Sequence, residues 1–140
     1  MGSNSAHLPK IAKKVPDNTE KESRVKRFSR WVNDERIEFE CYYLPYVEAL
    51  LASLAHRPLL LAIDGSEIGR GCLISMVSVI YEKRALPIAW IVVRGSKGHF
   101  PEETHVRLSE QVHDIVPEGC DVIFLGDGEF DGTTLQATIA

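Results

Sequence analysis

The spacing of hydrophobic residues changes near Pro58 and divides the chain into a helical part and a strand-rich part. Before this point, apolar residues recur at three- and four-residue intervals, which predicts helices over residues 19–40 and 45–57. Residues 1–19 are polar and contain two prolines, so they predict a flexible polar arm. We therefore expect a helical N-terminal segment over residues 20–57 that follows this arm.

After this point, the apolar residues form short runs that are typical of β-strands. Strands are predicted at residues 59–64, 72–81 and 86–93, and two tight turns join them. Such short connections produce an antiparallel meander, because parallel strands need a long crossover. The amphipathic segment 101–116 predicts a crossover helix, and the apolar run 121–126 predicts a fourth strand that lies parallel to the first.

These elements predict an α/β domain with a mixed sheet over residues 58–140. A further helix is expected to begin near Thr133. The chain has 140 residues, of which 44% are hydrophobic and 26% are charged. This length and composition are typical of a globular protein with one substantial core.

Two aspartates follow the two runs that we expect to be parallel strands. Asp64 ends the first run, and Asp127 comes directly after the fourth. Neighbouring strands lie about 4.8 Å apart, so carboxylates at their C-terminal ends would converge. Converging carboxylates repel unless a proton or a cation lies between them, and ionised carboxylates are preferred ligands of Mg²⁺. The pattern predicts a Mg²⁺ or Mn²⁺ site in which two ions promote attack on a phosphodiester.

Charge is distributed unevenly along the chain. Residues 1–36 contain nine Lys/Arg and five Asp/Glu, for a net charge of +4, whereas the remainder is acidic. A basic segment of this kind suits an anionic partner such as DNA. We expect phosphate contacts from four cations, which are Lys26, Arg27, Arg30 and Lys97. The longest apolar stretch, residues 85–93, is about half a membrane span, so no membrane partner is expected.

The order of these motifs resembles that of the DDE transposases of bacterial insertion sequences, which have a ribonuclease H-like fold. The resemblance is carried by "LLLAIDGSEIGRG", by the two meander strands and by "DVIFLGDGEFDG", and "ESRVKRFSRWV" resembles the segment before the catalytic core of these enzymes. It covers residues 20–140. It implies that Asp64 and Asp127 are catalytic metal ligands, and that the complete protein cuts and joins DNA at mobile-element ends. It also implies an oligomeric protein that acts in the bacterial cytoplasm.

Two features depart from the pattern of this family. The family uses a third acid, a glutamate from a helix well beyond the second aspartate, and residues 128–140 contain no counterpart of that helix. Gly128 stands where many relatives have arginine. We therefore expect an incomplete ribonuclease H-like core, the N-terminal part of a longer transposase, that is inactive by itself.

Two other functions also fit these residues. Cellular ribonucleases H share the topology and place a glutamate on the crossover helix, where Glu102 or Glu103 stands. A non-catalytic DNA-binding remnant would retain the basic segment, and Asp64 and Asp127 would then only begin Asp-Gly turns.

Overall fold

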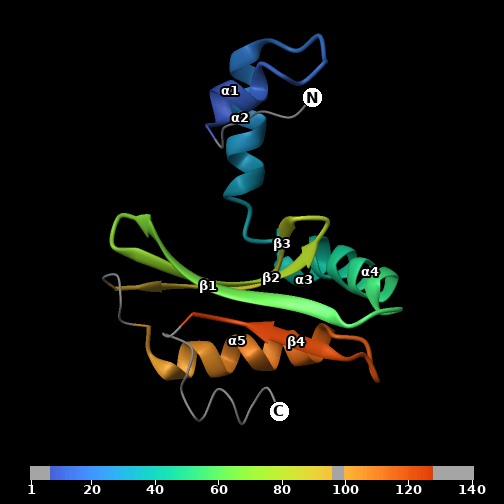
Figure 1. Cartoon of the computed structure of the whole chain (residues 1–140). Coiled ribbons are helices and arrows are strands. Elements are labelled where there is room, and N and C mark those ends of the chain that lie inside the picture. The colour runs from blue at the N-terminus through green and yellow to red at the C-terminus, as the bar shows by residue number, and fades with distance from the viewer. Residues whose placement is uncertain (1–6, 96–99, 128–140) are drawn as a thin grey trace. The chain divides into compact units, whose positions relative to one another are not determined.

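The computed structural model describes residues 7–95 and 100–127 (Figure 1). The chain divides into two compact units, Met1–Leu44 and Pro45–Ala140. None of the helices in the described part of the chain combines the length and the apolar character that a membrane crossing requires.

The first unit is helical. Its helices are α1 (Leu8–Ala12), α2 (Lys21–Val32) and α3 (Phe39–Tyr42). Helix α1 lies within the segment that we predicted to be a flexible arm, and a proline in its first turn favours its start. It packs against α2, where Ala12 is completely buried.

The helix predicted over residues 19–40 is two helices. Helix α2 ends at Val32, and the side-chain amide of the C-cap residue Asn33 donates a hydrogen bond to the carbonyl oxygen of Ser29. Thr19 does not cap this helix, because Glu20 is the N-cap residue and no side chain there makes a capping hydrogen bond. Thr19 instead donates its backbone N–H to the Asp17 carboxylate, at 3.0 Å.

The second unit contains α4 (Leu44–Leu54) followed by a mixed sheet. The strands are β1 (Leu59–Gly69), β2 (Cys72–Tyr81), β3 (Arg84–Arg94) and β4 (Val122–Leu125). Their order is β3-β2-β1-β4, with β1 antiparallel to β2, β2 antiparallel to β3, and β1 parallel to β4. The predicted meander with a parallel fourth strand is therefore confirmed.

The crossover helix is α5 (Glu102–Ile115), which lies along one side of the sheet (Figure 1). It packs against β2 and β3. Its buried residues Leu108 and Val112 belong to the same core as alternate residues of β1, among them Leu61 and Ile63. Alternation along β1 then directs Ala62 and Asp64 to the opposite face of the sheet.

The connection between β2 and β3 is a two-residue hairpin turn. Glu82 and Lys83 both have positive φ angles, 46° and 64°, between the paired residues Tyr81 and Arg84. Turns with two positive φ angles match the right-handed twist of the flanking strands, and here two residues other than glycine adopt them.

Candidate functional site

Asp64 lies inside β1, and our prediction that it ends the strand is wrong. The strand continues to Gly69 because its antiparallel pairing with β2 persists, and Asp64 itself pairs with Met76. The parallel ladder with β4, in contrast, ends at the pair Ala62 and Leu125. Asp64 therefore marks the position at which β1 loses β4 as its neighbour.

Asp127 lies two residues beyond the end of this parallel ladder. Each β1 residue pairs with the β4 residue 63 positions later, as Leu59 does with Val122 and Ala62 does with Leu125. The same offset relates Asp64 to Asp127. Both side chains are exposed. A continuation of the register would bring the two residues to the spacing of adjacent strands, about 4.8 Å.

The immediate surroundings of Asp64 are polar and open. The hydroxyl of Ser66, two residues further along the same face, lies 3.4 Å from Oδ2 of Asp64 and donates a long hydrogen bond to it. The described residues contain no group of three or more His, Cys, Asp or Glu side chains that could hold a metal ion. Two carboxylates are suitable ligands for Mg²⁺ or Mn²⁺, but water or substrate would have to complete the coordination shell. Asp64 and Asp127 alone, as two of the described carboxylates, would hold such an ion weakly.

The neighbouring residue, Gly65, faces the other side of the sheet. A Cβ atom placed on Gly65 would lie 2.7 Å from Cε2 of Phe100, so the phenyl ring occupies the space that any larger residue would need. The Phe100 ring also packs against His105 of α5, with 5.4 Å between the ring centroids. The segment that leads into α5 therefore covers the face opposite to Asp64.

The glutamates of the ribonuclease H alternative begin α5. Glu102 and Glu103 are its first two residues, and Glu103 is exposed. Helix α5 covers the face that Gly65 and Ser75 share, whereas alternation directs Asp64 to the other face. This arrangement favours the two-aspartate hypothesis over one that joins Asp64 to a glutamate of α5.

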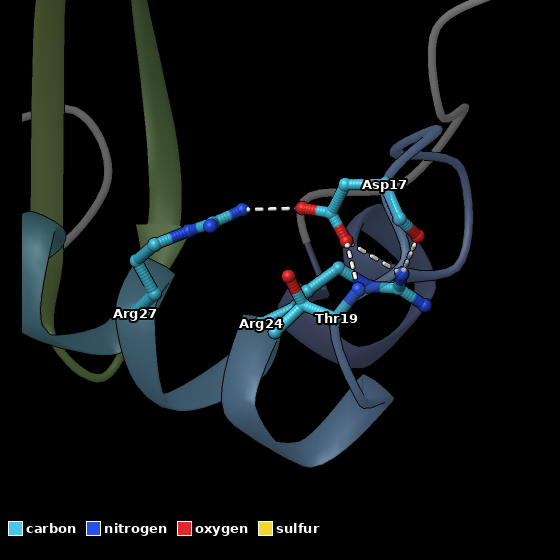
Figure 2. A network of polar contacts seen from close by, with 4 residues as sticks. All are labelled: Asp17, Thr19, Arg24 and Arg27. Atoms are coloured by element: carbon cyan, nitrogen blue, oxygen red, sulfur yellow. Dashed lines mark hydrogen bonds and ion pairs between the residues drawn. The ribbon is translucent and has the colours of Figure 1, made fainter.

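The basic residues of the first unit differ in their partners. Arg24 donates to Oδ1 of Asp17 and Arg27 donates to Oδ2, each at 2.8 Å (Figure 2). Arg24 also donates to the Asp17 backbone carbonyl at 2.8 Å. These guanidinium groups, together with the Thr19 N–H, hold the pKa of the Asp17 carboxyl well below its usual range. Of the predicted DNA-binding residues, Arg27 is therefore already paired.

The other predicted DNA-binding residues are on α2 or outside the described part of the chain. Lys26 and Arg30 of α2 are exposed, and Lys97 lies outside the described residues. Sequence reasoning missed Trp31, which is 54% exposed. Trp31 follows Phe28 by three residues, at the edge of the apolar stripe of α2, so its spacing gave no signal that it would be exposed.

A cavity of about 400 Å³ lies where the end of α4 meets the β2–β3 hairpin, and no motif of the sequence predicted it. Its lining includes Leu54, Arg57, Tyr81 and Glu82, and the Arg57 guanidinium lies 5.4 Å from the centroid of the Tyr81 ring. Tyr81 is five residues from Met76, the partner of Asp64, or about 17 Å along the strand. The cavity is thus separate from the two aspartates.

Comparison of the chain with protein-family models, curated proteins and solved structures finds no match.

Proposed function

We propose that this chain is part of a DDE-type transposase with a ribonuclease H-like core. In this proposal the complete protein cleaves and joins DNA at the ends of a mobile element in a reaction that depends on Mg²⁺ or Mn²⁺. Asp64 and Asp127 would be metal ligands and catalytic residues. Lys26, Arg30 and Lys97 would contact DNA phosphates, and Arg27 would do so when Asp17 releases it.

The observation that carries the proposal is the register between β1 and β4. The ladder pairs residues with a constant offset of 63, and the same offset separates Asp64 from Asp127. Two exposed carboxylates next to the end of a parallel ladder suit a hard divalent cation, which offsets their mutual repulsion. Such an ion would supply Lewis-acid chemistry to a bound phosphodiester. The two residues would hold the ion at a fixed place on the sheet.

The sheet order supports the same interpretation. A meander, a crossover helix and a parallel fourth strand place β4 beside β1, so a continuation of their register would bring residues 64 and 127 close to each other. A sheet that served only as a scaffold would have no need for a carboxylate at both positions, because each apolar run could end on any turn residue.

The proposal predicts that Asp64 and Asp127 bind Mn²⁺ jointly. Asp64→Asn and Asp127→Asn should each weaken Mn²⁺ binding about tenfold or more, because the amide is uncharged and a lost metal contact costs on that order. Isothermal titration calorimetry measures this directly. Asp121→Asn is the matched control, since Asp121 is an exposed aspartate at the other end of β4 and should not affect binding. Unchanged Mn²⁺ affinity in the Asp64→Asn/Asp127→Asn double variant would rule out the site.

A further inference from the structure

Two cations on the exposed side of α2 have no carboxylate partner among the residues that the structure describes. Within the described residues, the ion pairs of the first unit join Arg24 and Arg27 to Asp17 and Arg36 to Asp34, and none of them includes Lys26 or Arg30. Lys26 and Arg30 are four residues apart and both exposed, so they lie on the same side of the helix. Trp31, which is 54% exposed, follows directly.

Arg27 lies on the same helix but differs from Lys26 and Arg30 because it forms an ion pair with Asp17. Its Nη2 is 2.8 Å from Oδ2 of Asp17, although its side chain is 52% exposed. The other oxygen of this carboxylate binds Arg24, whose side chain is only 14% exposed. Asp17 therefore bridges two arginines, one largely buried and one accessible from solvent (Figure 2). A DNA phosphate that approached Arg27 would have to compete with this carboxylate.

We infer that Lys26 and Arg30 bind phosphates of duplex DNA and that Asp17 is an intramolecular competitor that withholds Arg27 from them. This inference rests on the proposed function, which identifies DNA as the partner. It adds that Asp17 controls whether Arg27 is available for DNA binding. A carboxylate and a phosphate both accept hydrogen bonds from guanidinium in the same forked geometry, so one can replace the other. Loss of the Asp17 charge would thus add one phosphate contact.

Charge and hydrophobicity together favour DNA over a membrane surface. Helix α2 contains five Lys/Arg and one Glu, so it suits an anionic partner. A helix that lies in a membrane interface needs a broad apolar face to insert. The apolar residues Val25 and Phe28 of α2 are half-buried within the folded unit, and only Trp31 and Val32 remain as large exposed apolar side chains.

The test compares two arginines of the same helix. Binding of the 140-residue chain to a fluorescein-labelled DNA duplex is measured by anisotropy between 50 and 200 mM salt. Each phosphate contact contributes about 0.9 to the slope of log K against log salt. Arg30→Ala should therefore reduce the slope by about 0.9, whereas Arg27→Ala should leave it nearly unchanged. Lys13→Ala, an exposed cation of the same unit that lies outside α2, is the control and should also have little effect.

A second arm tests the competitor. Asp17→Asn should steepen the slope by about 0.9, because the released Arg27 makes one additional phosphate contact. Between 50 and 200 mM salt, this corresponds to an about 3.5-fold larger loss of affinity. Addition of Arg27→Ala to this variant should cancel the gain. Asp34→Asn removes the same charge from the same unit and releases Arg36 instead, so it controls for net charge.

Several results would overturn the inference. If Arg27→Ala and Arg30→Ala reduced the slope of log K against log salt equally, Arg27 would already contact a phosphate and Asp17 would not compete for it. Equal losses for Lys13→Ala and Arg30→Ala would show a diffuse electrostatic attraction. Binding to phosphatidylserine vesicles without binding to the duplex would assign α2 to a lipid surface. The Asp64 and Asp127 variants separate the two proposals, since loss of Mn²⁺ binding should leave the salt slopes unchanged.

Discussion

At the scale of single residues, Asp17 has the most constrained environment among the described acidic groups of the first unit. Its carboxylate accepts hydrogen bonds from Arg24, Arg27 and the backbone of Thr19 (Figure 2). The two guanidinium groups are the main reason why its pKa is well below the usual range. Asp34 is paired with Arg36 alone, and its pKa is also lowered, although the 88%-exposed Arg36 side chain is well solvated.

These contacts predict how stability depends on pH. A carboxyl whose pKa is lower in the folded than in the unfolded state stabilises the fold above the unfolded value, about 3.9, and this stabilisation is lost as pH falls further. We expect the urea midpoint of the first unit, followed by circular dichroism, to fall below about pH 4. Asp17→Asn should lower the midpoint at pH 6 and flatten this dependence. Asp34→Asn should change it less, because exposed pairs contribute little. An identical pH profile for Asp17→Asn and the unmodified protein would contradict this assignment.

At the scale of elements, the packing of α5 against the sheet includes polar side chains. Ser75 of β2 is completely buried, and its Oγ lies 3.5 Å from Nδ1 of His105. Ser109, one turn further along α5, is 4% exposed, and within the described residues its hydroxyl has no hydrogen-bond partner. Burial of an unpaired hydroxyl costs free energy, whereas a hydrogen bond offsets most of this cost for a paired hydroxyl.

This difference predicts opposite effects for two matched substitutions. Ser109→Ala should be neutral or should stabilise the protein by about 1 kcal/mol, because it removes an unpaired buried hydroxyl and improves helix propensity. Ser75→Ala should destabilise by about 1 kcal/mol, because it removes a hydrogen-bond partner of His105. Urea denaturation measures both. If Ser109→Ala proved as destabilising as Ser75→Ala, Ser109 would have a polar partner after all.

At the scale of the whole molecule, the proposed site contains two carboxylates, which limits the number of divalent ions that it would hold. Two carboxylates hold one divalent ion, but a second ion needs further negative charge to offset the repulsion between the cations. A DDE transposase, according to our proposal, would take that charge from a third acid. Among the described residues no group of three potential ligands exists.

We therefore predict that the 140-residue chain does not cleave DNA or an RNA–DNA hybrid in the presence of Mg²⁺. Removal of a single group that stabilises charge in the transition state typically lowers the rate about 10²–10³-fold. A gel assay of both substrates, with a ribonuclease H as the positive control on the hybrid, measures this. Cleavage of the hybrid that Glu102→Gln or Glu103→Gln abolishes would instead identify a ribonuclease H.

Much of the sheet could be predicted from the sequence. The tight turns and the apolar runs of 72–81 and 121–126 predicted strands that the structure confirms within one or two residues. The site could be predicted only in part. The apolar run to Asp64 does not reveal that β1 continues, because residues 65–69 contain two glycines and a single apolar residue and remain extended through their pairing with β2.

The sequence by itself determined the order of the four strands and of the crossover helix, because the periodicity of apolar residues and the turn residues are local properties. Only the tertiary structure decided that β4 stops beside Ala62, so that Asp64 and Asp127 each lie two residues beyond the last pair of the parallel ladder. It also decided that Asp17 pairs with Arg27, while the described residues offer Lys26 no such partner. Both depend on which segments meet in space, and neither periodicity nor composition carries that information.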